Sequence, residues 1–200
     1  SLDPYGRFEW GVPPASRGDY AFVQHMLYSL AEDGRMAVIL PHGVLFRGAS
    51  EGRIRKEIIQ LNLLDAVIGL PEALFFGTGI PACIMVFKKN RTKKEVLFID
   101  ASGEGNFEKG KNQNKLREQD VEKIVETYEK YETIDKYSYV ASVEEIKEND
   151  YNLNIPRYVD TFEEEEPVDM EEVAKNIKSI KEEIKEVEEQ MAKYLEELGL

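Results

Sequence analysis

The stretch Met36-Ala37-Val38-Ile39-Leu40 is a short run of apolar residues, and Pro41 ends it. A run of this length bounded by turn residues is typical of a strand that is buried in a sheet. A second run, Leu64 to Leu70, stops in the same way at a proline, and residues 50–61 between the two runs have helical periodicity. A strand, a helix and a strand of these lengths predict parallel pairing of the two strands in a doubly wound sheet.

The segments on either side extend this α/β pattern. Upstream, Asp19 is a plausible N-cap for a helix that ends near Gly34, because apolar residues recur after it at helical spacing. Downstream, Cys83–Lys88 and Val96–Asp100 are two strand-like segments joined by the polar turn 90–94. They predict a hairpin-like pair at an antiparallel edge of the sheet.

The pattern changes after residue 100, and it divides the chain into four parts. Residues 1–100 are α/β, residues 101–160 predict a helical and extended extension, residues 161–169 an acidic linker, and residues 170–200 a single amphipathic helix. Within the extension, a helix is expected from about Arg117 to Tyr131. Its predicted buried face consists of Val121, Ile124, Val125 and Tyr128. A short helix is expected at 143–148, followed by an extended segment at 151–159.

The last helix has a heptad seam. Its apolar positions alternate in steps of three and four: Met170, Val173, Ile177, Ile180, Ile184, Val187, Met191, Tyr194 and Leu198. Glu and Lys occupy most flanking positions, so the apolar stripe is too narrow to pack a globular core and requires a partner helix. We therefore predict that a partner docks on Ile177, Ile180, Ile184, Val187 and Met191.

Composition restricts the class of protein. A chain of 200 residues can hold one core of ordinary size and an appendage. The net charge is −13, but residues 163–200 carry 14 acidic and 5 basic residues, a net −9, so the remainder carries only −4. The single cysteine, Cys83, excludes an internal disulfide and a four-cysteine zinc site, and the isolated His25 and His42 indicate no metal site. No apolar run is long enough for a membrane span and no signal pattern is present, so a soluble, cytoplasmic protein is expected.

The residues alone indicate no catalytic constellation. Val12-Pro13-Pro14-Ala15 resembles the Asn/Asp-Pro-Pro-aromatic motif of amino-methyltransferases only in its prolines, because Val12 and Ala15 cannot bind an exocyclic amine or stack on a base. No glycine-rich loop follows an N-terminal strand, so no nucleotide-like cofactor has a cradle here. At this level the sequence predicts a soluble α/β domain with a helical docking arm.

Several stretches nevertheless resemble one family in its order along the chain. They are Asp19–Leu27, Gly34–Gly48, Ile54-Arg55-Lys56, Val67–Pro71, Leu74-Phe75-Phe76-Gly77-Thr78-Gly79-Ile80-Pro81 and Tyr151–Ile155. These stretches are similar to the modification subunits of type I restriction-modification systems, which are adenine-N6 DNA methyltransferases. The resemblance covers about residues 17–160, and the stretch from Leu74 to Pro81 is its most specific part.

The resemblance implies a Rossmann-like sheet and S-adenosylmethionine as the cofactor. In that family the cofactor loop and the Asn-Pro-Pro-aromatic motif lie upstream of the Asp19 segment, so this chain would hold only the C-terminal strands and no catalytic residue. Those strands would be 36–40, 64–70 and 83–88, with 96–100 as an extra. We therefore expect this polypeptide to be inactive alone and to bind the cofactor weakly or not at all.

The resemblance also assigns roles to particular side chains. Asp19 and Phe22 correspond to positions that border the adenine of the cofactor. Phe75 or Phe76 corresponds to the aromatic residue that stacks on the flipped target base, and Thr78 and Ile80 would line the same pocket. The reaction would be direct transfer of a methyl group to adenine N6.

The partners implied are DNA and the specificity and restriction subunits of a type I system, with the heptad helix as a docking element. Two alternatives remain open on the sequence: a non-catalytic α/β interaction module that assembles a complex through this helix, and a methyltransferase with its specificity domain fused. An upstream methyltransferase half would distinguish the module from the enzyme. Because a truncated sheet has an unpaired edge, self-association through that edge or through the heptad helix is also expected.

Overall fold

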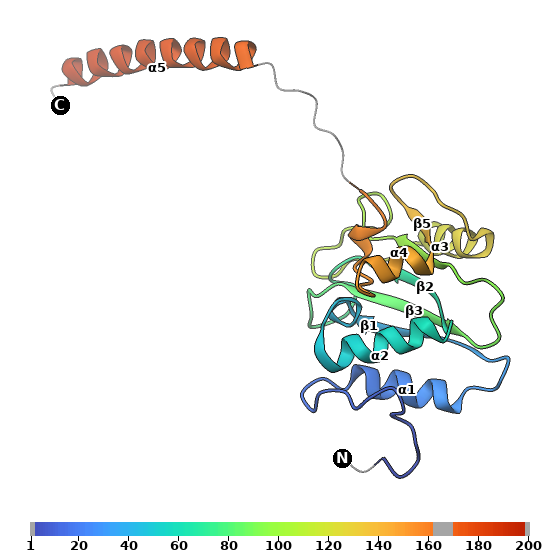
Figure 1. Ribbon diagram of the computed structural model, residues 1–200. Coiled ribbons are helices and arrows are strands. Elements are labelled where there is room, and N and C mark those ends of the chain that lie inside the picture. The colour runs from blue at the N-terminus through green and yellow to red at the C-terminus, as the bar shows by residue number, and fades with distance from the viewer. Residues whose placement is uncertain (1–2, 162–169, 199–200) are drawn as a thin grey trace. The chain divides into compact units, whose positions relative to one another are not determined.

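The computed structural model describes residues 3–161 and 170–198. The chain forms two compact units, Ser1–Thr161 and Phe162–Leu200. The first contains one five-stranded sheet with helices on both faces, and the described part of the second is the helix α5 (Met170–Leu198) (Figure 1).

The strand order in the sheet is β1-β3-β2-β4-β5. The strands are β1 (Arg35–Pro41), β2 (Leu64–Gly69), β3 (Ala82–Lys88), β4 (Val96–Asp100) and β5 (Ser138–Ala141). β3 is antiparallel to both β1 and β2, and β4 is parallel to β2. β1, β2 and β4 therefore run in the same direction and end at the same edge of the sheet.

This order corrects two predictions from the sequence. β1 and β2 have the same direction, but they are not paired, because β3 lies between them. β3 and β4 do not form a hairpin, and β3 is an interior strand. The reason lies in the turn that joins β3 to β4. Arg91 in this turn donates hydrogen bonds to the side chain of Asn62 and to the carbonyl oxygen of Leu64, so the connection crosses the start of β2 and leaves β3 and β4 on opposite sides of it.

The burial of the strands follows their position in this order. All residues of β2 and β4 are buried, as their apolar runs predict. β1 was also expected to be buried, and this was wrong, because it is an edge strand that exposes alternate residues, among them Ile39 at 53%. β5 was not predicted from the sequence.

Three helices lie on one face of the sheet: α1 (Asp19–Ser29), α2 (Ala49–Gln60) and α4 (Val143–Glu148), which contributes Ile146. α1 and α2 pack Val23, Leu27, Ile54 and Ile58 against β2 and β3 in the larger core (Figure 1). The N-cap of α1 is Gly18 and not Asp19, which is the first helical residue. A helix before and after β1 was confirmed; α2 lies within one residue of its expected ends, whereas α1 ends at Ser29 and not near Gly34.

The opposite face is covered only in part. α3 (Glu118–Lys130) packs Ile124 against β2 and β4, but Val121 and Val125, which were expected to be buried, are exposed. α3 reaches β2 and β4 but leaves the same face of β1 and β3 open, and the two valines face that open space. The helix α4 (Val143–Glu148) was confirmed. The segment 151–159 was expected to be extended and instead contains the 3-10 turn η2 (Ile155–Arg157).

Candidate functional site

The carboxyl ends of β1, β2 and β4 bring three connecting segments to one edge of the sheet. They are the 3-10 turn η1 (His42–Leu45), the loop 70–81 and the residues after Asp100. In open α/β sheets, ligands bind outside the carboxyl ends of the strands. The residues that the sequence assigned to the target-base pocket, Phe75 to Ile80, lie on this edge.

The loop 70–81 is braced at its base. The backbone amide of Asn114 donates to the carbonyl oxygen of Ala73 at 2.9 Å, and its side-chain amide donates to the carbonyl oxygen of Glu72 at 2.9 Å. The side chain of Gln113 donates to the carbonyl oxygen of Leu74. The polar loop before α3 therefore fixes the position of the aromatic loop. Sequence analysis did not find Gln113 or Asn114, because nothing in their local sequence indicates a contact some 40 residues away.

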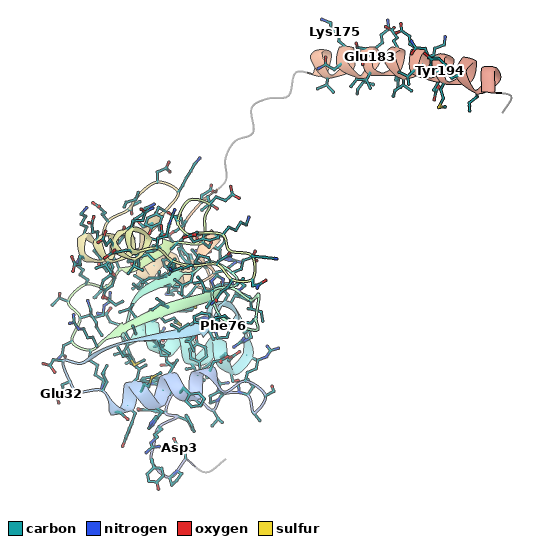
Figure 2. All side chains as sticks on the ribbon, turned by 180° about the vertical axis from the view of Figure 1, so that it is seen from behind. Asp3, Glu32, Phe76, Lys175, Glu183 and Tyr194 are labelled. Carbon is teal, nitrogen blue, oxygen red and sulfur yellow. The ribbon has the colours of Figure 1, made fainter. Side chains whose placement is uncertain are left out.

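The tip of the loop presents its side chains to solvent. Phe76 is 90% exposed, whereas Phe75 is 42% exposed and contributes to the wall of an apolar groove (Phe76 is labelled in Figure 2). Thr78 Oγ1 accepts a hydrogen bond from the amide of Ile80 at 3.1 Å, so the turn holds its own shape. The structure thus separates the two phenylalanines that the sequence treated as equivalent: Phe76 offers a free aromatic face and Phe75 packs partly against the protein.

Asp19 and Phe22 lie on α1 near the same edge, because α1 runs back from the carboxyl end of β1. The carboxylate of Asp19 accepts a hydrogen bond from Arg47 Nη2 at 2.6 Å, and Arg47 also pairs with Glu51 at 2.6 Å. The hydrogen bond to Glu51, and then the one to Asp19, raise the pKa of Arg47 against the opposing effect of burial, so this guanidinium stays charged. Phe22 is 69% exposed. Arg47 already occupies Oδ2 of Asp19, which leaves Oδ1 and the ring of Phe22 for any ligand.

A buried network anchors the segment that follows β1. Tyr20 donates its hydroxyl hydrogen to the carbonyl oxygen of Val44 at 2.9 Å, and Arg55 Nη1 donates to the same oxygen at 3.0 Å. Arg55 Nε also donates to the carbonyl oxygen of Tyr151 at 2.7 Å. This network ties residues 44–47, and with them Arg47, to the segment near Tyr151 that shares the family resemblance.

His42 lies at the same edge, directly after β1. Its Nε2 is buried and has no hydrogen-bond partner among the described residues. Burial lowers the pKa of this imidazole, against smaller opposing effects of the Ala82 backbone and of Asp100, so the ring is neutral at pH 7. Sequence analysis interpreted His42 as structural, and its position next to the candidate pocket was not visible from spacing.

An apolar groove of about 710 Å³ crosses the open face of the sheet from this edge. β1 and β3 form its floor, and α3 together with Leu74 and Phe75 of the aromatic loop forms its walls. The other apolar residues of the lining include Ala37, Ile39, Ile84, Val86, Val121 and Val125. The groove is the uncovered surface expected beside an unpaired edge strand.

Two classes of site are not found in the described part of the chain. Residues 3–161 and 170–198 contain no cluster of three or more His, Cys, Asp or Glu side chains that could hold a metal ion. In the same residues, no helix combines the length and the apolar character that crossing a membrane requires.

Comparison with known proteins identifies the family. The family model described as N-6 DNA Methylase matches residues 2–167, and the chain belongs to this family. Within it, the chain is similar to methylase subunits of type I restriction enzymes. The MjaVII methylase subunit of Methanocaldococcus jannaschii is 41% identical over 192 residues, which are 93% of this chain and 33% of that protein. The HindI methylase subunit of Haemophilus influenzae is 38% identical over 83% of this chain and 39% of that protein.

Solved structures confirm the fold. The type I restriction-modification methyltransferase subunit from Streptococcus thermophilus superposes with a TM-score of 0.77 and is 52% identical, over 80% of this chain and 34% of that one. The M protein of the type I restriction enzyme EcoKI superposes with a TM-score of 0.51 at 25% identity. The chain spans about a third of the length of the curated relatives that it matches.

Proposed function

We propose that this chain contributes the target-base side of an adenine-N6 DNA methyltransferase of a type I restriction-modification system. The observation that carries the proposal is the solvent-exposed ring of Phe76 on a braced loop at the carboxyl edge of the sheet. A flipped adenine needs an aromatic face on which to stack, and such stacking is worth roughly 1–3 kcal/mol. Phe76 stacks on the base, while Phe75, Thr78 and Ile80 line the pocket around it.

The bracing of the loop matters for the same reaction. Unstacking a base from the duplex costs a few kcal/mol, and a pocket that is already ordered loses less entropy when the base enters. Asn114 and Gln113 hold the base of the loop through three hydrogen bonds to its backbone. They act as positioning residues for Phe76 and do not contact the base themselves.

The cofactor of this reaction is S-adenosylmethionine, which supplies an electrophilic methyl group when it is bound. The residues of this chain do not by themselves fit it. Asp19 already accepts from Arg47, and Phe22 offers only one exposed ring. The described residues provide no glycine-rich turn that could receive the nucleoside. In this proposal Asp19 and Phe22 border the adenine of the cofactor, and the remaining contacts come from other parts of the full-length protein.

The partners proposed are DNA and the specificity and restriction subunits. The apolar stripe of α5 is exposed along Ile177, Ile180, Ile184, Val187 and Met191. An exposed stripe of this length on one helix is suited to a coiled coil with a helix of the specificity subunit. The alternative, a non-catalytic interaction module, has less support, because the relatives over most of this chain are methylase subunits.

A chimera tests the proposal. Residues 1–161 replace the corresponding stretch of the Streptococcus thermophilus subunit, and the product is assembled with its specificity subunit. We expect methyl transfer to adenine N6 of the cognate DNA. Phe76→Ala in the chimera should lower the rate about tenfold, equivalent to roughly 1.4 kcal/mol of lost stacking.

The matched control is Tyr28→Ala, which removes an exposed aromatic ring at the other end of α1 and should leave the rate unchanged. A folded chimera that assembles but transfers no methyl group, while the unmodified Streptococcus subunit is active, would contradict the proposed function. Equal losses for Phe76→Ala and Tyr28→Ala would contradict the role of Phe76.

A further inference from the structure

A second pocket lies at the opposite edge of the sheet, where β1, β2 and β4 begin. Its volume is about 650 Å³, and residues from three separate parts of the fold line it: β1, the β3–β4 turn and the end of α3. Five of the lining residues are cationic: Arg35, Lys88, Lys89, Arg91 and Lys93. Only Asp65 and Glu129 are acidic. The pocket is therefore locally positive on a chain whose net charge is −13.

Arg91 fixes the shape of the turn that carries most of these charges. Its side chain is only 3% exposed, and it donates to Asp65 Oδ1 at 2.9 Å and to Asn62 Oδ1 at 2.9 Å. The side-chain amide of Asn62 donates back to the carbonyl oxygen of Arg91 at 3.1 Å. Arg91 is thus a structural residue that anchors the turn, and its neighbours in the turn point away from the core.

The single buried carboxylate does not neutralise this pocket. Asp65 pairs with both Arg91 and Lys88 at 2.9 Å and accepts a hydrogen bond from the hydroxyl of Tyr128. One negative charge faces two positive charges, so a net positive charge remains at this cluster. Glu129, the other acidic residue of the lining, is exposed like several of the cations, so the lining as a whole has five cationic and two acidic side chains, a surplus of three positive charges.

Three further cations form no ion pair within residues 3–161, and the neighbouring carboxylate of Glu95 accepts a hydrogen bond from the backbone amide of Lys94 instead. Arg35 is exposed and forms no ion pair or hydrogen bond through its side chain within residues 3–161. Lys93 Nζ lies 4.1 Å from the centroid of the Tyr131 ring, an arrangement that orients the ammonium group. Lys94 follows in the same turn and is exposed.

The lining selects the chemistry of the partner. The two tyrosine rings are already covered, Tyr131 by Lys93 and Tyr128 by Lys88, whose Nζ is 5.1 Å from the ring centroid. The turn has no open aromatic or apolar side chain, and Val125 of α3 is the one exposed apolar residue of the lining, so the pocket offers little of the buried apolar anchor that a protein partner requires. The turn can therefore bind a partner through ion pairs, as Lys and Arg side chains bind the phosphodiester backbone of DNA.

We propose that this basic turn, residues 88–94 together with Arg35, binds the phosphate backbone of DNA at a surface separate from the target-base pocket. The two surfaces lie at opposite ends of strands of up to seven residues, which corresponds to about 20 Å. The turn binds without sequence preference and adds affinity for DNA that flanks the methylated site. The inference rests on the proposed function in one respect, that DNA is the polyanion this protein encounters.

The test measures binding of the full 200-residue chain to a duplex of arbitrary sequence by fluorescence anisotropy, between about 50 and 200 mM salt. The variant combines Arg35→Gln, Lys93→Gln and Lys94→Gln, three side chains that are all exposed. We expect the affinity at low salt to fall roughly tenfold or more, and the slope of log K against log salt to become shallower by about 0.9 for each lost contact, about 2.7 in total.

The control combines Lys175→Gln, Lys178→Gln and Lys181→Gln in α5, which change the net charge equally and should leave the slope as it is. The proposal is overturned if the unmodified chain does not bind the duplex, or if both variants lose the same affinity for it. It is also overturned if polyglutamate displaces the labelled duplex as well as unlabelled DNA of the same charge does. The chimera is tested for methyl transfer on a short duplex, which does not depend on the basic turn. Failure of the DNA-binding proposal is therefore distinguishable from failure of the proposed function.

Discussion

Asp65 is a buried carboxylate at the start of β2 on which the β3–β4 turn depends. Burial alone would raise its pKa, but the hydrogen bonds from Tyr128 and Lys88 and the charge of Arg91 together lower it below 3.8. Asp65→Asn leaves the nearly inaccessible guanidinium of Arg91 without its counter-charge. Removing one partner of such a pair should lower the free energy of unfolding by about 3 kcal/mol, measured by urea denaturation. Glu126→Gln, which removes the exposed partner of Lys130, is the control and should change it by less than about 0.5 kcal/mol.

The same residue predicts a pH dependence. Because the folded-state pKa of Asp65 is lower than that of the unfolded chain, the unfolded chain binds more protons between the two values. The stabilisation is therefore complete above 3.8 and is lost as the pH falls through the folded-state pKa. The difference in the free energy of unfolding between the unmodified chain and Asp65→Asn should therefore become smaller as the pH decreases in that range. A constant difference down to acid unfolding would exclude a lowered pKa.

At the scale of elements, two surfaces could join copies of this chain: the open edge and groove at β1, and the stripe of α5. In a parallel pair of α5 helices, the heptad register places Glu183 of one copy opposite Glu188 of the other. This like-charge contact occurs twice and disfavours pairing of α5 with itself. β1 has no such obstacle, because Ile39 lies on an apolar floor beside unpaired backbone groups.

We therefore predict self-association through β1 at tens of micromolar, measured by light scattering. Ile39→Lys places a charge on the groove and should yield a monomer, whereas Ile184→Lys on α5 should leave the associated state in place. If the unmodified chain is monomeric, association through β1 and association through α5 are both contradicted. Loss of association only in Ile184→Lys would identify α5 as the interface.

The element scale also shows where sequence patterns were sufficient. Apolar runs and helical periodicity predicted β1 to β4 and α1 to α4, although α1 ends at Ser29 and not near Gly34, because burial is encoded locally. They did not give β5, a four-residue strand without an apolar run. They overestimated the buried face of α3. The periodicity of Val121 and Val125 indicates an apolar face of the helix, but it does not indicate whether another element covers that face.

At the scale of the whole molecule, the chain spans about a third of the length of the curated relatives that it matches, and we propose that its edge residues form part of the methyltransferase site. Asp19 has one free carboxylate oxygen and Phe22 one exposed ring, which together give few contacts to a nucleoside. We predict that isothermal titration of this chain with S-adenosylmethionine gives no saturable heat. The chimera described above serves as the positive control. Tight, stoichiometric binding to the chain alone would show that its own residues suffice.

The candidate site was partly accessible from the sequence. The family resemblance placed an aromatic pocket at Phe75 to Ile80, but it could not choose between the two phenylalanines. Exposure separates them, and exposure depends on how Gln113 and Asn114 hold the loop from a distant part of the chain. The partner of Asp19 was hidden for the same reason, since Arg47 is 28 residues away.

By itself, the sequence determined the extents of most elements, the heptad pattern of the last helix and membership of a methylase family, because these depend on local periodicity and on linear motifs. Only the tertiary structure decided the strand order, the basic pocket and the difference between Phe75 and Phe76. The physical reason is that the apolar sequence of a strand indicates that the strand is buried, but it does not indicate which strand is its neighbour. In this protein the choice is made by long-range contacts, above all those that hold Arg91 across the start of β2.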